Sequence, residues 1–502
     1  MNEIESFDRD ACYRALRTRD GRFDGRFYTA VVTTGIYCRP ICPVRPPKLE
    51  NCIFLPSAAA AQAAGFRACL RCRPELAPGV ASWRGTANTV SRALALIAEG
   101  ALNDGDGVEA LATRLGVGGR HLRRLFERHL GASPVAVAQT QRILFAKKLI
   151  GETDLTMTEV ASAAGFGSIR RFNAAMRKVY DRPPRSLRRQ PTRASAASGD
   201  AIQLSLSYTK PYDWPAILGF LGTRAIPGIE TVEDGVYRRT IALDDASGLV
   251  EVEPDTARER LIARIRLSKV TALATVVDRL RRLFDLDADI AAIGRQLSQD
   301  PLLAPALAAR PGLRVPGAWD GFELAVRAIL GQQVSVAGAR TLAGRLVARF
   351  GRPYEGPGAS PDEGLSLLFP TPAALAEAEV AAIGMPGARA RALSGLAKAF
   401  EADPDLLRPF DSLAASVETL CALPGVGPWT AHYIAMRALG EPDAFPASDL
   451  GLLRALAAGG PRPSPAEAEA RAESWRPWRA YALFHLWMMD AEASANAGKA
   501  AA

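Results

Sequence analysis

The spacing of four cysteines constrains the fold of this chain more than any other sequence feature. Cys38 and Cys42 form a C-x3-C pair and Cys69 and Cys72 a C-x2-C pair, in a chain of 502 residues with only seven cysteines. Each close pair can supply two sulfurs from one tight turn, which suits a tetrahedral zinc site. A structural site is the first interpretation of such spacing. Arginines flank both pairs, however, and they favour a site that faces phosphates.

Charge is distributed unevenly along the chain. Residues 1–195 contain 31 Lys and Arg against 17 Asp and Glu, whereas the remainder is net acidic. The basic part is therefore predicted to bind nucleic acid. The chain opens on an acidic, polar segment and has no apolar run of membrane-spanning length. We expect a cytoplasmic, nucleoid-associated bacterial protein with no membrane partner.

An internal repeat organises the basic part. Residues 109–134 match residues 159–184, and each copy predicts a helix, a glycine-containing turn and a second helix. A long helix over 133–150, capped by Ser133 and opened by Pro134, is predicted to join the two helix-turn-helix units.

In the second helix of each copy, apolar residues mark a buried face and leave six polar side chains outward. Arginine suits guanine edges in the major groove and asparagine suits adenine edges. The alternative for each side chain is a contact to phosphate alone. The six residues are Arg120, Arg123, Arg124, Arg170, Arg171 and Asn173.

The second half of the chain predicts two further folds. A Pro/Ser/Ala/Gly-rich segment at 191–200 predicts a linker. Residues 202–315 mix strand and helix patterns, which predicts a small α+β domain, and residues 316–490 are predicted to be almost entirely helical. The expected strands are 202–208, 235–243 and 260–267, and the expected helices of the α+β domain are 214–221 and 270–284.

The sequence LPGVG at 423–427 predicts the turn of a helix-hairpin-helix. Gly425 and Gly427 would allow a sharp turn and let backbone N–H groups approach a DNA phosphate at the start of the next helix. Many such hairpins only bind DNA. An acid, Asp449, follows about twenty residues later. Asp449 has two interpretations, a catalytic carboxylate or a helix cap.

The strings FYTAVVTTGIYCRPICPVRP and AAGFRACLRCRPE, over about residues 8–78, resemble the N-terminal domain of Ada-type methylation sensors. The resemblance implies that Cys38 is a zinc ligand, with Cys42, Cys69 and Cys72, and also takes a methyl group from a DNA methylphosphotriester. Methylation would change the formal charge of a zinc–tetrathiolate site from −2 to −1, which could switch DNA binding. The repeat resembles the AraC-type DNA-binding domain. No Pro-Cys-His-Arg string is present, so O6-alkylguanine methyltransferase activity is not expected.

Four strings over about residues 202–490 resemble AlkA-type alkylated-base glycosylases of the helix-hairpin-helix superfamily. The strings are YTKPYDWPAILGFL, AILGQQVSV, LPGVGPWTAHYIAMRALG and WRPWRAYALFHLW. The resemblance implies a TATA-binding-protein-like domain followed by a helical core, with Asp449 as the catalytic carboxylate. It also implies an electron-rich base pocket that favours a cationic base. The implied pocket residues are Trp429, Tyr433, Trp487 and Phe220.

At two positions the chain differs from relatives in the superfamily in a way that bears on mechanism. Trp429 stands where lyase members of the superfamily have a lysine, so strand cleavage is not expected. Gln333 stands where AlkA-type relatives insert an apolar wedge into the duplex, which leaves its role open. Cys421 is the only cysteine of this half, so the four-cysteine iron–sulfur loop is missing and we expect no cofactor for the glycosylase.

Together these patterns predict a multidomain, mainly α-helical fusion protein. The expected boundaries are 1–80, 81–190, 191–201, 202–315 and 316–492, in the order zinc domain, helix-turn-helix domain, linker, α+β domain and glycosylase core. The expected partners are double-stranded DNA and RNA polymerase, and the expected state is a monomer. The alternative is a transcription regulator with a structural zinc site and an inactive, DNA-binding glycosylase-like half.

Overall fold

The computed structural model describes residues 8–77, 88–103, 107–188, 201–243, 245–359, 364–407, 412–457 and 460–500. The predicted linker at 191–200 lies outside these ranges. The chain forms two compact units, one of Met1–Tyr208 with Pro254–Asp278 and one of Thr209–Glu253 with Arg279–Ala502. None of the helices in the described ranges is both long enough and apolar enough to cross a membrane.

A small sheet with strand order β3-β1-β2-β4 holds the cysteine pairs. Strand β2 (Ile36–Cys38) runs parallel to β4 (Arg67–Ala68), with Tyr37 opposite Ala68. Because parallel strands end at the same edge of a sheet, Cys38 and Cys69 leave it side by side. The other elements of this region are β1 (Tyr28–Val31), β3 (Cys52–Leu55), α1 (Arg9–Thr18), α2 (Ala58–Ala63) and the 3-10 helix η3 (Pro74–Leu76).

The predicted helix-turn-helix repeat is present. The first copy contains α4 (Val108–Arg114) and α5 (Gly119–Leu130), and the second contains α7 (Met157–Ala163) and α8 (Ile169–Tyr180). Helix α6 (Pro134–Glu152) joins the two copies, and α3 (Asn88–Ala98) precedes the first. Ser133 caps α6 and Pro134 opens it, as predicted. Gly116 and Gly165 take left-handed backbone angles in the two equivalent turns. Phe126 and Phe172 are fully buried at corresponding positions of α5 and α8.

Buried polar contacts join the zinc region to α6 within the first unit. The side chain of Gln62 donates to the Tyr37 hydroxyl at 2.9 Å and accepts from the Thr140 hydroxyl at 3.0 Å. Lys147, 5 % exposed, lies 3.6 Å from the carboxylate of Glu75. Buried charges and amides of this kind are costly unless paired, so these contacts define how the two regions pack.

The strands expected at 202–208, 235–243 and 260–267 are confirmed as β5 (Ile202–Ser207), β7 (Val236–Leu243) and β9 (Arg260–Leu267). Strand β5 pairs with β9, and β7 pairs with both β6 (Glu230–Glu233) and β8 (Ala246–Asp255), all antiparallel. Strands β6 and β8 were not predicted. Strand β8 contains Gly248 and Pro254, which weaken a strand pattern, and β6 has only four residues.

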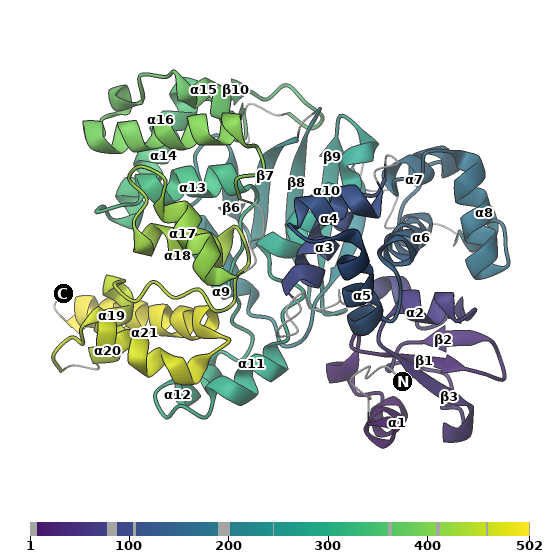
Figure 1. Cartoon of the computed structure of the whole chain (residues 1–502). Helices are drawn as coiled ribbons and strands as arrows, with labels where there is room; N and C mark the ends of the chain where they lie inside the picture. Colours follow the sequence, from purple (N-terminus) through teal and green to yellow (C-terminus); the bar gives the residue numbers. More distant parts are fainter. Residues whose placement is uncertain are drawn as a thin grey trace. The chain divides into compact units, whose positions relative to one another are not determined.

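The second unit is mainly helical, as predicted (Figure 1). Helix α13 (Gly321–Leu330) packs against α14 (Val336–Phe350), α16 (Gly387–Ala402) and α18 (Pro428–Arg437), and its apolar residues are buried. The predicted helices at 214–221 and 270–284 are α9 (Trp214–Gly222) and η6 (Val270–Ala272) with α10 (Leu273–Leu283). A two-stranded ladder of β10 (Arg352–Pro353) and β11 (Leu367–Leu368) was not predicted.

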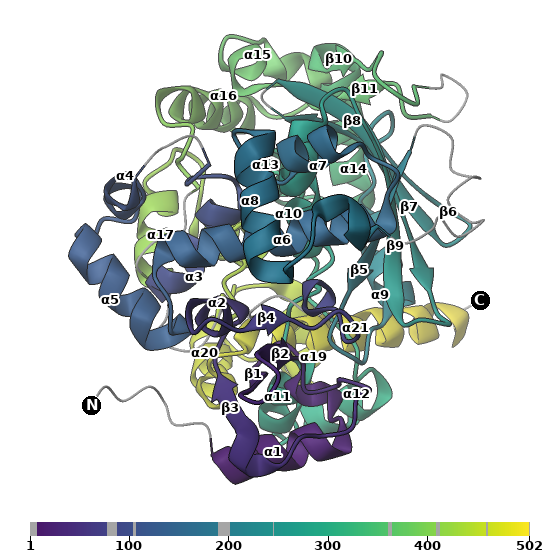
Figure 2. The same cartoon turned by 90° about the vertical axis from the view of Figure 1, so that its right-hand side faces the viewer.

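The remaining helices complete this unit (Figure 2). Helix α21, which carries the RAYALFHLW part of the WRPWRAYALFHLW string, packs against α12 and α19. The elements are α11 (Ile290–Leu297), α12 (Leu303–Ala309), α15 (Pro372–Ala376), η8 (Val380–Ile383), α17 (Leu413–Cys421), α19 (Leu450–Ala457), α20 (Pro465–Ala472), η9 (Glu473–Trp475) and α21 (Arg479–Ala500).

Candidate metal centre and base-excision site

The four predicted ligands, Cys38, Cys42, Cys69 and Cys72, come together. Their sulfur atoms all lie within 4.8 Å of one another. A zinc ion with Zn–S bonds of about 2.3 Å holds its four sulfurs about 3.8 Å apart, a separation that falls within this limit, so the four residues fit a zinc ion. Three of the four side chains are buried, and Cys38 is the most accessible.

The arginines beside the cysteines divide into two groups. Arg39 is 7 % exposed, and its guanidinium donates to Asp24 at 2.8 Å and to the carbonyl of Cys72 at 3.0 Å. Its backbone N–H points at the Cys72 sulfur at 3.3 Å. Arg39 therefore supports the cluster from within, and it does not face phosphates as the sequence pattern suggested.

The second group lines an open cavity of about 470 Å³. Cys38, Cys42 and Cys69 form part of its wall, and the arginines include Arg45, Arg67 and Arg71. An external molecule can therefore reach the sulfur of Cys38 past cationic side chains.

The outward side chains of the helix-turn-helix repeat lie as predicted. Arg120, Arg123, Arg124, Arg170 and Arg171 are exposed and Asn173 is half-buried. Arg123 forms an ion pair with Glu109 at 2.9 Å, and Arg124 lies 3.0 Å from a ring nitrogen of His121. Ser168 caps α8, which places Arg170 in its first turn. Base contacts by these residues stay a prediction.

In the second unit, three N–H groups converge on the carboxylate of Asp449. Its Oδ1 accepts from the indole of Trp487 at 2.8 Å and from the backbone of Leu452 at 2.9 Å. Its Oδ2 accepts from the indole of Trp429 at 2.9 Å. The contact to Leu452 is a helix cap on α19, so the capping role is present together with the aromatic contacts.

The aromatic residues form an open chain of contacts that passes through Asp449. Trp429 and Tyr433, one turn apart on α18, stack with ring centroids 5.3 Å apart and an 8° interplanar angle. On the other side, Phe220 contacts Phe484 at 5.2 Å, and Phe484 contacts Trp487 at 5.0 Å. Phe484 was missed by the sequence analysis. It lies three residues before Trp487 on α21, and that helical spacing was the available signal.

Two arginines close this chain of contacts, and neither was predicted. Arg437 donates to the Tyr433 hydroxyl at 2.8 Å and lies 4.7 Å from the Phe220 ring centroid. Arg224 lies 3.8 Å from the same ring. Burial alone would raise the pKa of Tyr433, but Arg437 and Arg224 outweigh it and lower that pKa below its usual value. Phe220, one of the expected pocket residues, is therefore flanked by two guanidiniums, and the base pocket itself stays a prediction.

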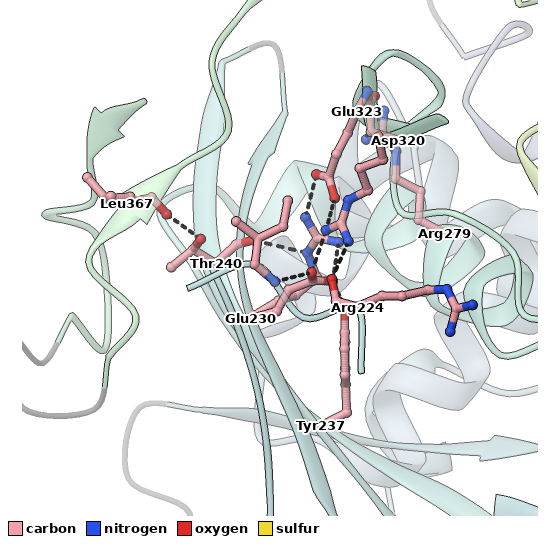
Figure 3. A network of polar contacts seen from close by, with 11 residues as sticks. Arg224, Glu230, Tyr237, Thr240, Arg279, Asp320, Glu323 and Leu367 are labelled. Carbon is pink, nitrogen blue, oxygen red and sulfur yellow. Dashed lines mark hydrogen bonds and ion pairs between the residues drawn. The ribbon is translucent and has the colours of Figure 1, made fainter. Parts of the chain in front are cut away.

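A buried charge network lies beside Arg224 (Figure 3). The carboxylates of Glu230 and Glu323 point toward one another, and the guanidiniums of Arg239 and Arg327 each pair with both. Arg327 also donates to the backbone carbonyl of Arg224 at 3.0 Å. The network thus fixes the backbone from which Arg224 reaches Phe220.

The two hairpin glycines have different roles. Gly425 has φ +78°, and a Cβ there would lie 2.4 Å from the Cβ of Ala392, so the fold requires glycine. Gly427 has φ −90°, and a Cβ there would meet nothing within 4 Å. The start of α18 is therefore uncrowded at this position, and a phosphate contact there stays a prediction. Gln332, also missed, braces the hairpin by donating to the Gly425 carbonyl at 2.8 Å and to the Thr430 hydroxyl at 3.0 Å.

Gln333 is exposed in the short loop between α13 and α14. Its φ of +55° is a left-handed conformation that L residues seldom adopt, and the residue next to it, Val334, is 38 % exposed. The loop therefore presents one polar and one apolar side chain at its tip. A wedge role for Gln333 stays a prediction.

Four family models match successive parts of the chain. They are the metal binding domain of Ada (residues 11–75), the helix-turn-helix domain (111–190), the AlkA N-terminal domain (203–320) and the HhH-GPD superfamily base excision DNA repair protein (326–480). Their order agrees with the order of the sites described above.

Known relatives match the whole chain or one half of it. A Mycobacterium tuberculosis protein, "Probable bifunctional transcriptional activator/DNA repair enzyme AlkA", is 45% identical over 96% of both chains. Escherichia coli DNA-3-methyladenine glycosylase 2 is 38% identical over 57% of this chain and 97% of its own length. Escherichia coli Ada, a bifunctional transcriptional activator/DNA repair enzyme, is 33% identical over 32% of this chain and 44% of its own length. The chain belongs to the AlkA family of bifunctional transcriptional activators and DNA repair enzymes.

Proposed function

We propose that the N-terminal half accepts a methyl group from a DNA methylphosphotriester at Cys38 and then activates transcription. The observation that supports this assignment is the position of Cys38, the one residue of the four clustered cysteines that is not fully buried, in the wall of an arginine-lined cavity. The buried ligands Cys42, Cys69 and Cys72 would hold the site together while Cys38 reacts.

The transfer is a displacement at carbon. The Cys38 sulfur donates an electron pair to the methyl carbon, and the carbon–oxygen bond of the triester breaks toward oxygen. The products are a thioether and an ordinary anionic phosphodiester. Zinc, when bound by the four cysteines, keeps the sulfurs in the thiolate form at neutral pH. The chain's own contribution is to orient Cys38 at the end of β2 and to bring the phosphate to it through the cavity arginines.

Intact-mass spectrometry after incubation with a duplex that carries methylphosphotriesters tests this assignment. We expect a gain of one methyl group, located on Cys38 by peptide mapping, and no gain for Cys38→Ala. A methyl group on another cysteine would contradict the role of Cys38. Absence of any uptake would favour the alternative of a structural zinc site.

We propose further that the C-terminal half hydrolyses the N-glycosidic bond of alkylated bases with Asp449. Three donors fix the carboxylate between the indoles of Trp429 and Trp487, and this placement beside the expected base-pocket residues supports the assignment. As the C1′–N bond breaks, its electron pair leaves with the base and C1′ develops cationic character. The Asp449 carboxylate stabilises that charge, and water adds to C1′ and loses a proton.

Release of free base from methylated duplex, followed by chromatography, tests the second assignment. We expect a free base and an intact abasic strand, because Trp429 cannot form the Schiff base that a lysine would. A strand nick that borohydride traps as a covalent adduct would contradict a hydrolytic mechanism without lyase activity. Tight DNA binding without base release would favour an inactive glycosylase-like half.

The proposed activator role extends to partners. Methylation of Cys38 makes the cluster less negative beside DNA phosphates, so promoter affinity rises. The helix-turn-helix repeat reads the promoter, and the chain contacts RNA polymerase as a monomer. Analytical ultracentrifugation with promoter DNA and polymerase checks both the stoichiometry and the contact.

A further inference from the structure

The cavity beside Cys38 has a wall that comes from the second helix-turn-helix unit. Besides residues of the zinc region, it is lined by Tyr180, the last residue of α8, and by Arg182 just beyond it. These two residues lie more than 100 positions from Cys38 in the sequence. The cavity is therefore assembled from two regions that the sequence analysis treated as separate functions.

Local structure holds this wall in place. The ring of Tyr180 is buried, with 5 % of the residue exposed. Asp181 follows in the left-handed conformation with φ +55° and caps α8 through a backbone bond to the Arg177 carbonyl at 2.8 Å. This turn directs the chain out of the helix, so that Arg182 reaches the cavity.

An ion pair joins the two regions at the cavity. Asp181 accepts from Arg67 at 3.0 Å, and Arg67 also lines the cavity. Both side chains are well exposed, at 44 % for Arg67 and 78 % for Asp181, so the pair adds little stability. Its effect is positional, because it keeps the segment around Arg182 against the strand that leads to Cys69. Among the contacts of the described residues, no ion pair is found for Arg182 itself.

The charges of the substrate indicate what Arg182 can bind. A methylphosphotriester is neutral, so the methylated phosphate itself attracts no cation. The unmethylated phosphodiesters on either side of it are anionic and attract cations. A cavity that presents sulfur at one place and arginines at others can hold the neutral phosphate at Cys38 by binding its charged neighbours.

We propose that the second helix-turn-helix unit completes the methyl-acceptor site, with Arg182 binding a phosphodiester next to the methylated phosphate. Arg182 is thus a positioning residue for transfer to Cys38. The inference rests on the proposed methyl-acceptor function and goes beyond it. It makes the same unit that reads promoter DNA a part of the damage-sensing site.

A short substrate isolates this contact from the recognition helices. The probe is a tetranucleotide whose central phosphate is methylated and whose two flanking phosphates are ordinary diesters. The rate of methyl uptake is measured by mass spectrometry for the parent, Arg182→Ala, Arg182→Lys and the control Arg185→Ala. Arg185 is exposed three residues further on and does not line the cavity.

We expect Arg182→Ala to slow uptake roughly tenfold and to weaken its salt dependence, because one cation–phosphate contact is lost. Arg182→Lys should recover most of the rate, and Arg185→Ala should match the parent. Equal rates for the parent and Arg182→Ala would overturn the inference, as would a parent that reacts with duplex but not with the tetranucleotide. A parent that takes no methyl group from duplex either would instead refute the methyl-acceptor function.

Discussion

The indole nitrogen of Trp429 lies 2.9 Å from Oδ2 of Asp449, twenty positions away in the sequence. The contact joins the first turn of α18 to the residue that caps α19. Trp429 therefore has a structural role, in addition to standing where lyase relatives have a lysine. The indole stacks on Tyr433 and at the same time holds the carboxylate.

We predict that Asp449→Asn abolishes excision of alkylated purines. The substitution keeps the size of the side chain and removes the negative charge that stabilises the developing cation at C1′, so the excision rate should fall by roughly 10²–10³-fold. Single-turnover base release measures the rate, and fluorescence anisotropy measures DNA affinity. Full excision by the variant, with unchanged affinity, would show that another group performs the chemistry.

The two indole donors can be tested separately from the aromatic stacking. Trp487→Phe keeps a ring on α21 but removes one hydrogen bond to Asp449, and Trp429→Phe removes the other. Each hydrogen bond to a charged group contributes about 1.5–3 kcal/mol, so each variant should lose roughly tenfold or more in single-turnover rate. Phe484→Leu, which removes a ring but no donor, is the control for packing. If the tryptophan variants fell no further than Phe484→Leu, the donors would have no role in positioning the carboxylate.

Gln332 is predicted to matter for DNA binding through the hairpin. Gln332→Ala removes the donor to the Gly425 carbonyl and leaves the hairpin without its brace. We expect weaker binding to all duplexes, damaged or not, whereas Gln333→Ala should affect lesion-containing duplex alone if Gln333 enters the gap. Anisotropy titrations on matched damaged and undamaged duplexes distinguish the two residues. Identical profiles for both variants would contradict separate roles.

The buried network of Glu230, Glu323, Arg239 and Arg327 predicts that Glu323→Gln strongly lowers the free energy of unfolding. The variant leaves two guanidiniums with a single carboxylate in a buried site, and removal of one partner from such a site costs about 3–5 kcal/mol. Amide exchange of α13 during urea titration follows the affected region. Glu355→Gln, at an exposed position, is the control. A loss no larger than that of the control would mean that the network is solvated in solution.

Acid should destabilise the second unit through His485. Burial lowers the pKa of His485 to about 4, below its ordinary value of 6.5. Because the folded state disfavours the proton, this contribution to stability is complete above pH 6.5 and is lost as the pH falls toward 4. For a pKa shift of this size, the free energy of unfolding falls by about 3 kcal/mol. Urea unfolding at pH 7 and pH 4.5 should show a smaller difference for His485→Leu than for the parent, and an equal difference would contradict the assignment to His485.

The variant Arg170→Ala distinguishes base reading from phosphate binding in the helix-turn-helix repeat. If Arg170 reads a base, Arg170→Ala should cost about 1–3 kcal/mol at one position of the promoter and relax the preference there. Binding assays on promoter variants measure the effect. Equal weakening on every sequence would assign Arg170 to phosphate.

Local patterns in the sequence predicted those parts of the sites that one element or one turn determines. The cysteine pairs and the capped helix at Pro134 are of this kind, whereas Trp429 and Tyr433 were expected only from the resemblance to AlkA-type glycosylases. Arg437 could not be predicted from local patterns, because tertiary packing alone brings it to Phe220. The contribution of Arg182 to the cavity beside Cys38 has the same origin, since no local signal relates residues so far apart. Arg224 lies only four positions after Phe220, so its contact is local and was overlooked.

The central claim is that one chain is both a single-use methyl acceptor and a hydrolase with repeated turnover. A duplex that carries a methylphosphotriester and an N-methylpurine, offered in excess, tests both halves in one reaction. Mass spectrometry counts methyl groups on the protein while chromatography counts free base. We predict one methyl group per chain, on Cys38, together with many released bases per chain and no strand nick. DNA binding with neither methyl uptake nor base release would contradict the account.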